Sequence, residues 1–212
     1  ISLWLSRPIR FGAVPKNITG VDPSEEMLKI ARKKFQKFHN VKFTCALGHE
    51  SGCESGEADI ISISYGIRNV VERAQTLNEF NRIIVKAIRE SGGNNENRFL
   101  MVPSYAASQD FALNKSFSMP EDMANRTMLS VHAYTPYDFA GSASGYKEWD
   151  GSKTTEFNFM GKLMSKFIHE GYGVVIGEFG ATNKDNPEDR ERWARGYTMK
   201  ASSLGISYFI WD

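Results

Sequence analysis

The amino-acid sequence predicts an α/β fold of repeated strand–helix units, with about seven mostly parallel strands. One observation is the alternation of short β-branched runs with longer amphipathic segments along the chain. Another is that some strand-like runs are apolar throughout, as expected for parallel strands covered on both faces. The clearest run, Val174-Val175-Ile176-Gly177-Glu178, ends in a glutamate bracketed by glycines. Such a strand places one carboxylate at the carboxyl end of the sheet in an α/β fold. A carboxylate is seldom there for packing, because an unpaired buried charge is costly.

The composition is that of an ordinary globular protein. The 212 residues are 41% hydrophobic and 24% charged, and the formal net charge is +1. This near balance argues against a nucleic-acid partner, which would call for a basic surplus. No apolar run is long enough to span a bilayer, so we expect no membrane partner. The chain begins at Ile1 rather than at Met, and we expect residues to be missing from both ends.

The two cysteines are too few for a disulfide framework. Cys45 lies in an apolar run and is expected in the core, whereas Cys53 lies in a loop rich in Gly and Ser. His49 and Glu50 add little to a metal-ligand set, so we expect no metal site.

The first part of the chain predicts strands at residues 18–22, 41–47 and 58–65. Pro8 and Pro15 break any long element in residues 1–17. After the first strand a helix begins, with Ser24 as a plausible N-cap and acidic residues in its first turn. Its lysines and arginines are expected to form a solvated face. Its apolar face is expected to hold Met27, Ile30, Ala31 and Phe35.

The second part predicts a long helix over about residues 70–90 and strands at 98–105, 127–134, 173–180 and 207–212. Residues 106–126 are expected to be loop with irregular helix. Residues 135–153 form a long loop rich in Gly, Ser and Tyr, of the kind that often carries function. Further helices are expected at 154–171 and from Pro187 to about 203, with the proline in the favoured first turn.

Ligands of parallel α/β folds bind at the carboxyl ends of the strands, where this chain has Tyr105, His132 with Tyr134, Glu178 and Trp211. The set suits sugar chemistry. Aromatic faces stack on pyranose rings, a glutamate attacks or stabilises an anomeric carbon, and the histidine and tyrosine hold that glutamate ionised. Each residue alone has a plainer interpretation: a glutamate paired with a loop, a core histidine, a strand-end tyrosine, a core tryptophan. Only the joint pattern favours a site.

From about Leu77 to Asp212 the chain resembles the C-terminal half of family 5 glycoside hydrolases of the endoglucanase type. The stretches that carry the resemblance are LNEFNRIIVKAIRESGGNNENRFLMVPSYAAS, SVHAYTPYDFAG, GVVIGEFGATNKDNPEDR and ISYFIWD. That family folds as a (β/α)₈ barrel and hydrolyses β-1,4-glucans with retention. The resemblance therefore implies a half barrel of strands five to eight, with a β-glucan or cello-oligosaccharide as its ligand.

By this resemblance, Glu178 is the nucleophile after strand seven, and His132 and Tyr134 are the strand-six pair beside it. Trp211 is the aromatic of strand eight under the sugar. Tyr105 is a further substrate-binding candidate. Trp149, in the long loop, is another, for which packing of the loop is an equal alternative.

From about Ile18 to Glu79 the chain resembles a different family, the class I ubiquinone/menaquinone C-methyltransferases. The stretches ITGVDPSEEMLKIARKKF and ADIISISYGIRNVVERAQTLNEF carry this second resemblance. It implies a Rossmann-like fragment in which Asp22 binds the ribose of S-adenosylmethionine. No glycine-rich loop precedes the strand that ends at Asp22, so we expect no cofactor.

The two resemblances predict a methyltransferase-like fragment at residues 1–76 joined to a half barrel at 77–212, packed as two domains or as one. We interpret the chain as a chimera, engineered or recombined, or as a composite sequence; unnoticed natural ancestry is the less favoured explanation. The hydrolase part lacks the segment with the acid/base, although retaining hydrolysis needs two carboxyls about 5–5.5 Å apart. Glu79 lies on a helix and is not nominated, and Glu50 is a weak substitute.

The predicted function is therefore retaining β-1,4-glucan hydrolysis, impaired by the missing acid/base. The alternatives are a non-catalytic chimera that binds at most oligosaccharide, and a remnant methyltransferase. A half barrel leaves a sheet edge open, which the front fragment or a homo-oligomer would cover. The hydrolase resemblance suggests export and the methyltransferase resemblance the cytoplasm, so the compartment stays open.

Overall fold

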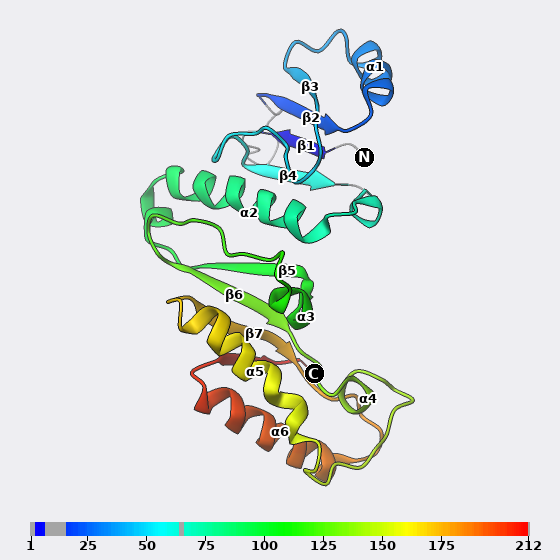
Figure 1. Ribbon diagram of the computed structural model, residues 1–212, viewed down its shortest axis with the longest axis vertical. Helices are drawn as coiled ribbons and strands as arrows, with labels where there is room; N and C mark the ends of the chain where they lie inside the picture. Colours follow the sequence, from blue (N-terminus) through cyan, green and yellow to red (C-terminus); the bar gives the residue numbers. More distant parts are fainter. Residues whose placement is uncertain (1–2, 7–15, 64–65, 212) are drawn as a thin grey trace. The chain divides into compact units, whose positions relative to one another are not determined.

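Figure 1 shows the computed structural model, which describes residues 3–6, 16–63 and 66–211. The chain forms two compact units: unit 1 comprises Ile1–Leu100 with Ser118–Arg126, and unit 2 comprises Met101–Phe117 with Thr127–Asp212. The described residues form two four-stranded sheets, of strand order β3-β2-β1-β4 and β5-β6-β7-β8. The predicted α/β class is confirmed. The division expected between residues 76 and 77 stays a prediction.

The sheet of unit 1 mixes strand directions. Strand β1 runs antiparallel to both β2 and β4, whereas β2 and β3 are parallel. The described elements of unit 1 are β1 (Leu3–Ser6), β2 (Ile18–Asp22), α1 (Glu25–Lys34), β3 (Val41–Cys45), β4 (Ile60–Ile63), η1 (Ile67–Asn69), α2 (Arg73–Glu90) and η2 (Gly93–Glu96). Strand β1 is an addition to the predicted set, because the prolines nearby left residues 1–17 without an assigned element. Residues 64, 65 and 212, at the ends of two predicted strands, lie outside the described residues.

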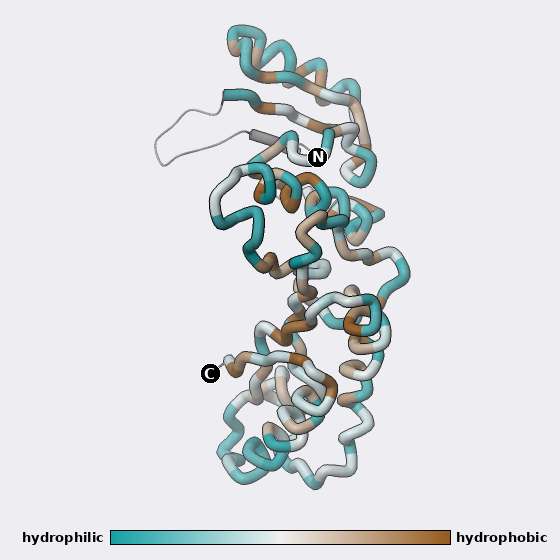
Figure 2. The backbone as a smooth tube through the Cα atoms, turned by 90° about the vertical axis from the view of Figure 1, so that its left-hand side faces the viewer, coloured by the Kyte–Doolittle hydropathy of each residue, from teal (hydrophilic) through white to brown (hydrophobic). Residues whose placement is uncertain are grey.

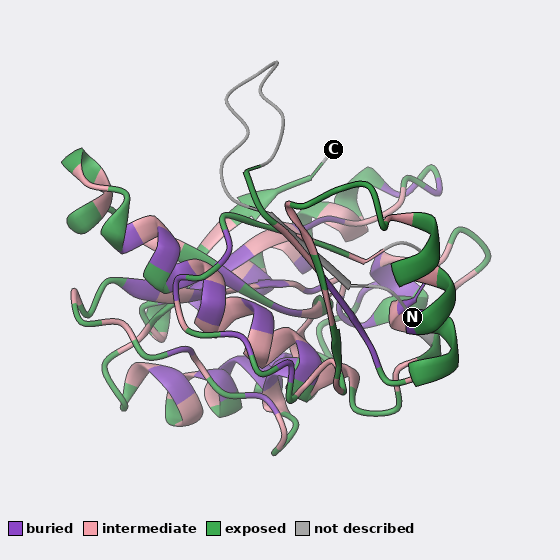
Figure 3. Cartoon of the chain, turned by 90° about the horizontal axis from the view of Figure 1, so that it is seen from above, coloured by how far each residue is buried: buried purple, intermediate pink, exposed green. Residues whose placement is uncertain are grey.

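Helix α1 begins as predicted but buries a different face. The Ser24 hydroxyl accepts the backbone N–H of Met27 at 3.3 Å, which confirms the N-cap. Leu28 is 2% exposed, whereas Met27 and Ile30, expected in the apolar face, are 54% and 63% exposed. The helix packs on β2 and β3 along the line of Leu28 and Phe35, two turns apart, so Met27 and Ile30 lie off the contact. Figure 2 shows hydrophobic and hydrophilic residues alternating along α1, and Figure 3 colours it mainly as exposed.

The prediction for Cys45 is wrong, and Cys53 is buried within its loop. Cys45, expected in the core, is exposed at the end of β3. Cys53 is 7% exposed and packs in a cluster with Phe80 and Ile83 of α2. Its loop folds back onto the helix, where Arg82 donates to the Cys53 carbonyl oxygen at 2.5 Å. Burial raises the pKa of the Cys53 thiol, so this cysteine behaves as a small core residue.

Helix α2 ties residues 118–126 into unit 1. Arg89 is 8% exposed, and its Nε and Nη2 each donate at 2.8 Å to an oxygen of Asp122. The same guanidinium donates to the carbonyl oxygens of Asn95 and Arg98 at 2.7 and 2.6 Å. The Arg89 hydrogen bonds hold the pKa of Asp122 well below its usual range, at about 2. The pair is therefore a buried, fully bonded ion pair rather than a surface contact.

The sheet of unit 2 pairs β6 with β7 and β7 with β8, both in parallel. Helix α6 and the segment of α5 with η4 pack against these strands (Figure 1). Along β6 the residues alternate between buried and half-buried positions. The described elements are β5 (Leu100–Ser108), α3 (Gln109–Leu113), β6 (Thr127–His132), α4 (Tyr137–Ala140), η3 (Thr154–Phe157), α5 (Asn158–Leu163), the π-helical turn η4 (Met164–Ile168), β7 (Gly173–Phe179), α6 (Pro187–Ser203) and β8 (Ser207–Ile210).

Within the residues that the structure describes, no helix has the length and apolar character needed to cross a membrane. Over the same residues, no group of three or more His, Cys, Asp and Glu side chains is placed to hold a metal ion.

Candidate active site

A β-bulge at Gly177 brings Glu178 beside His132. In the pairing of β6 with β7, Val131 lies opposite Ile176, but the next pair is His132 with Glu178. Gly177 is thus the extra residue, and the register toward β8 shifts in the same stretch. A bulge of this kind redirects the side chain that follows it. Without the extra residue, Gly177 rather than Glu178 would face His132.

The carboxylate of Glu178 is approached by two side chains of the β6 end. The Tyr134 hydroxyl donates to Glu178 Oε2 at 3.1 Å, and His132 Nδ1 lies 3.1 Å from the same oxygen. His132 and Tyr134 are two residues apart in an extended segment, so they project to the same side of the sheet. The side chains of His132 and Glu178 are 38% and 27% exposed, so solvent and a ligand can reach them. The structure therefore brings together the three residues predicted to be catalytic.

The tyrosine of this cluster is kept protonated. Burial raises the pKa of Tyr134, and the hydrogen bond to Glu178 and the charge of that carboxylate raise it further. A phenol with a raised pKa stays a donor over the whole neutral range. It therefore remains a hydrogen-bond donor to the Glu178 carboxylate.

Trp211 lies at the end of the next strand and is exposed rather than core. Its side chain is 62% exposed, and its backbone N–H donates to the Phe179 carbonyl oxygen at 2.8 Å. A Cβ on Gly180 would lie 2.5 Å from the Trp211 carbonyl oxygen and 3.7 Å from the Tyr134 ring. Only glycine permits this close approach. Trp211 is therefore not packed in the core.

The other predicted aromatic contacts are placed differently. Tyr105 lies on β5, one strand from β6 and two from β7, with its ring edge-on to Phe111 at 4.8 Å. Trp149 is 3% exposed and its ring stacks on Phe157 at 5.7 Å, and its backbone N–H donates to Asp189 Oδ1 at 2.7 Å. The low exposure of Trp149 and its stacking on Phe157 favour the loop-packing alternative over a substrate contact.

A polar groove of about 690 Å³ lies beside the cluster and shares His132 and Tyr134 as lining residues. Gln109, Asp110 and Glu156 line it as well, and the Gln109 amide donates to the Thr135 hydroxyl at 3.0 Å. These groups were not among the predicted site residues, because the strand before them was predicted to end at residue 105. Had the strand been extended to residue 108, the strand-end rule would have pointed to residues 109 and 110.

The residues of unit 1 that the structure describes do not fit S-adenosylmethionine, the cofactor that the methyltransferase resemblance implies. Asp22 is 1% exposed, and its Oδ1 accepts the backbone N–H of Ser24 at 2.8 Å, so the carboxylate caps the start of α1. Strand β1, which would precede a cofactor loop, runs antiparallel to β2. The carboxyl end of β1 therefore does not lie beside the carboxyl end of β2, where Asp22 stands. The Asp22 role proposed from the sequence therefore has no support in the geometry.

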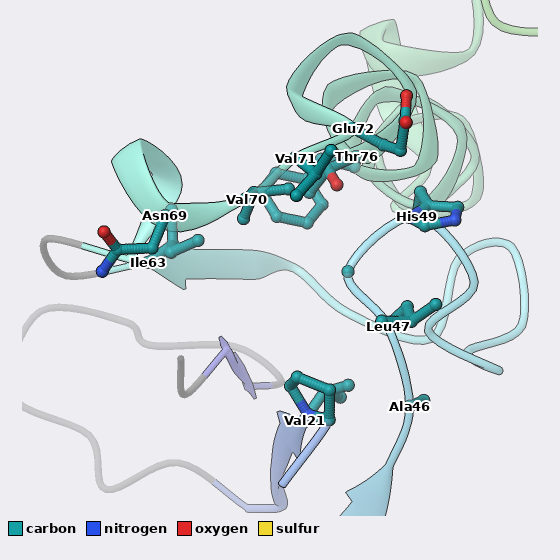
Figure 4. A pocket seen from close by; sticks show the side chains of 13 residues that line it. Val21, Ala46, Leu47, His49, Ile63, Asn69, Val70, Val71, Glu72 and Thr76 are labelled. Carbon is teal, nitrogen blue, oxygen red and sulfur yellow. The ribbon is translucent and has the colours of Figure 1, made fainter.

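The neighbouring cavity is also unsuited to that cofactor. Figure 4 shows a pocket of about 260 Å³ between the ends of β2, β3 and β4 and the start of α2. Its lining is mostly apolar, and Asp22 is not part of it. S-adenosylmethionine carries a sulfonium, an ammonium and a carboxylate, each of which needs a polar partner on burial. The pocket offers mainly side chains such as Val21, Leu47, Ile63 and Val70.

Two protein families match the chain, in different places. Residues 57–212 match the cellulases of glycosyl hydrolase family 5, and residues 3–94 match the ubiE/COQ5 methyltransferase family. The matches overlap over residues 57–94, and the junction expected near Leu77 falls inside that overlap. This pattern is consistent with a chain composed of two fragments of different parentage.

The curated relatives are endoglucanases. Endoglucanase B of Neocallimastix patriciarum is 45% identical over 140 residues, which are 64% of this chain and 29% of that protein. Endoglucanase 1 of Ruminococcus albus is 37% identical over 141 residues, which are 66% of this chain and 34% of that protein. The chain thus spans about a third of the relatives that it matches.

The solved structures that resemble this chain include enzymes of the same family. A family 5 lichenase variant from Caldicellulosiruptor sp. F32, solved in complex with cellotetraose, has a TM-score of 0.63 at 29% identity, over 96% of this chain and 59% of that one. A broad-specificity endoglucanase from Clostridium acetobutylicum has a TM-score of 0.62 at 36% identity, over 68% of this chain and 44% of that one. The sheet β5–β8 is thus half of a (β/α)₈ barrel, as predicted. Through residues 57–212, the chain belongs to glycosyl hydrolase family 5.

Proposed function

We propose that unit 2 carries the nucleophile half of a retaining β-1,4-glucan hydrolase, with Glu178 as the nucleophile and cello-oligosaccharides as ligands. One observation carries the proposal: the Glu178 carboxylate stands at the end of β7 with Tyr134 and His132 both 3.1 Å from Oε2. Because both contacts are made to Oε2, Oε1 is left for attack on an anomeric carbon. The solved relative with bound cellotetraose supports the choice of ligand.

The roles of the three residues follow from their contacts. The Tyr134 hydroxyl donates to Oε2 and so orients the carboxylate of Glu178 before attack. In the attack, a Glu178 oxygen bonds to the anomeric carbon while the bond from that carbon to the leaving oxygen breaks. His132, against the same carboxylate oxygen, fixes the rotamer of Glu178 and can hydrogen-bond a sugar hydroxyl through its Nε2. Trp211 offers its exposed ring for stacking against the sugar.

No proton donor for the leaving group is assigned among the residues that the structure describes. A general acid needs a raised pKa and a place close to the nucleophile. Glu79 does not qualify, because its carboxylate accepts hydrogen bonds from Ser51 at 2.6 Å and from Arg82 at 2.8 Å. Burial alone would raise the pKa of Glu79, but these bonds outweigh it and the pKa is lowered. We therefore propose that the chain attacks activated glycosides and turns over natural glucan slowly or not at all.

This form of the proposal has a direct test. A 2,4-dinitrophenyl β-cellobioside loses its phenolate without help from an acid, so it isolates the nucleophile step. The expected result is a burst of about one equivalent of dinitrophenolate and a mass increase on the peptide that contains Glu178. Glu178→Gln should abolish both, whereas Glu188→Gln, at the exposed start of α6, should change neither. A folded wild-type chain without burst or adduct would refute the nucleophile assignment.

The second candidate function is oligosaccharide binding without chemistry. The exposed indole of Trp211 favours it, because sugar stacking needs no second carboxylate. Calorimetric titration with cellotetraose separates the two functions: binding without a burst supports the second, and a burst supports the first. The homo-oligomer expected from an open sheet edge stays a prediction, for which light scattering is the test.

A further inference from the structure

Helix α6 holds the backbone on both sides of Tyr134. The Tyr197 hydroxyl donates to the Ala133 carbonyl oxygen at 2.7 Å, and Trp193 Nε1 donates to the Thr135 carbonyl oxygen at 3.0 Å. Tyr197 and Trp193 are 0% and 1% exposed and lie one helical turn apart, so they present one face to the strand end. Strand β6 ends at His132, so both carbonyl groups lie beyond the strand.

The same two side chains also reach the strand that carries Glu178. The ring of Phe179, the next residue after Glu178, stacks on Tyr197 with centroids 4.8 Å apart and planes 6° apart. Trp193 lies 5.9 Å from the same ring. The Ala133 N–H donates to the Glu178 carbonyl oxygen at 2.9 Å. The peptide groups at Ala133 therefore link Tyr197, Glu178 and Tyr134.

We propose that Tyr197 and Trp193 are positioning residues, which act through the backbone at Ala133 and Thr135 to hold the Tyr134 hydroxyl against Glu178. The catalytic purpose of these contacts rests on the proposed function. Their effect on the position of the Tyr134 hydroxyl does not. Catalytic groups must be held to a fraction of an ångström, and side chains locked by packing and buried hydrogen bonds provide that precision. Neither residue touches the substrate in this scheme.

The hydroxyl of Tyr197 is the feature that core packing does not explain. A phenylalanine would fill the same space without burying a polar group, and burial raises the pKa of this phenol. Most buried hydroxyls have a hydrogen-bond partner, and for Tyr197 it is the carbonyl oxygen next to Tyr134. The indole N–H of Trp193 makes the matching contact one turn earlier on the helix.

The test measures the titration of Tyr134 rather than turnover. Protein labelled with ring-¹³C tyrosine is titrated by NMR, with Tyr134→Phe used to assign the signal. Wild-type Tyr134 should titrate above the ordinary value, because it is buried and bonded to Glu178. In Tyr197→Phe and in Trp193→Phe, which keep a ring in place, the titration should move back toward about pH 10. Tyr208→Phe is the matched control, because its hydroxyl meets Ser202 instead.

Each outcome decides the proposal. An unchanged Tyr134 titration in a folded Tyr197→Phe protein would overturn it, because a core-only role lowers stability without moving that titration. If Tyr197→Phe does not fold, Trp193→Phe decides in the same way. Failure of both to fold would also overturn it, because the hydrogen bonds would then serve the core. The measurement needs no substrate, so a missing dinitrophenolate burst would count against the proposed function and leave this result standing.

Discussion

Tyr134 and Glu178 are 44 residues apart in the chain and meet through a hydrogen bond of 3.1 Å between the phenol and Oε2. The bond depends on two local features: the bulge at Gly177, which redirects Glu178, and the backbone beyond β6, which presents Tyr134. The pair is thus a product of the register between β6 and β7.

Removal of the Tyr134 hydroxyl should slow formation of the glycosyl-enzyme. Tyr134→Phe deletes the donor to Glu178 and leaves the ring in place, so the carboxylate loses a contact that organises it. We expect the burst rate with the dinitrophenyl glycoside to fall by about 10²-fold. Tyr137→Phe is the control, because Tyr137 is 68% exposed three residues further on. A Tyr134→Phe burst within twofold of wild type would show that the hydrogen bond has no part in the step.

The sequence predicts those features of the site that depend on neighbouring residues, and it does not predict those that depend on residues far apart in the chain. The end of β7 at a glutamate could be predicted because it depends on a local run of β-formers and glycines. The bulge at Gly177 could not, because register is a property of two strands. Likewise, the Trp149 backbone N–H meets Asp189, 40 residues later, and Cys53 packs with Phe80 and Ile83. Long-range contacts of this kind leave no periodic signal in a single segment.

The glycine after the site strand should be intolerant of a side chain. In Gly180→Ala the new Cβ would lie 2.5 Å from the Trp211 carbonyl oxygen, so the backbone must move. We expect a loss of about 1–3 kcal/mol in the free energy of unfolding. Gly161→Ala is the matched control, because a Cβ there meets nothing within 4 Å and alanine favours the helix. Urea denaturation measures both, and equal stabilities for the two variants would contradict the geometry at Gly180.

The buried pair of Arg89 and Asp122 should make stability depend on pH. The folded pKa of Asp122 is about 2, below its unfolded value, so the pair stabilises the fold above the unfolded pKa. That contribution is lost as pH falls from about 4 through 2, and it amounts to about 2 kcal/mol when complete. Asp122→Asn should therefore lower the free energy of unfolding at pH 7 by at least this amount, and by less at pH 3.

The control for this pair is Glu191→Gln, which breaks an exposed pair with Arg195 whose side chains are both 70% exposed. Exposed pairs contribute about 0–1 kcal/mol, so stability should change little at either pH. A loss for Asp122→Asn that is the same at pH 3 and pH 7 would mean that the charge of Asp122 is not what stabilises unit 1.

The two tryptophans considered for substrate binding should respond in opposite ways to removal. Trp149→Ala opens a cavity in an aromatic cluster where the indole is 3% exposed, so we expect a loss of about 3–5 kcal/mol in stability. Trp211→Ala removes an indole that is 62% exposed, so stability should stay within about 0.5 kcal/mol. If Trp211 stacks on a sugar, its removal should weaken cellotetraose binding by about tenfold, since a stacking contact contributes about 1 kcal/mol.

The opposite response would reassign both residues. A Trp149→Ala protein that stays stable but loses binding would return Trp149 to the site, against its contacts with Phe157 and Asp189. A Trp211→Ala protein that binds cellotetraose as wild type does would show that Trp211 does not stack on the bound sugar. In that case the polar groove lined by His132 and Tyr134 becomes the place to look for the sugar, because it shares these two residues with the Glu178 cluster.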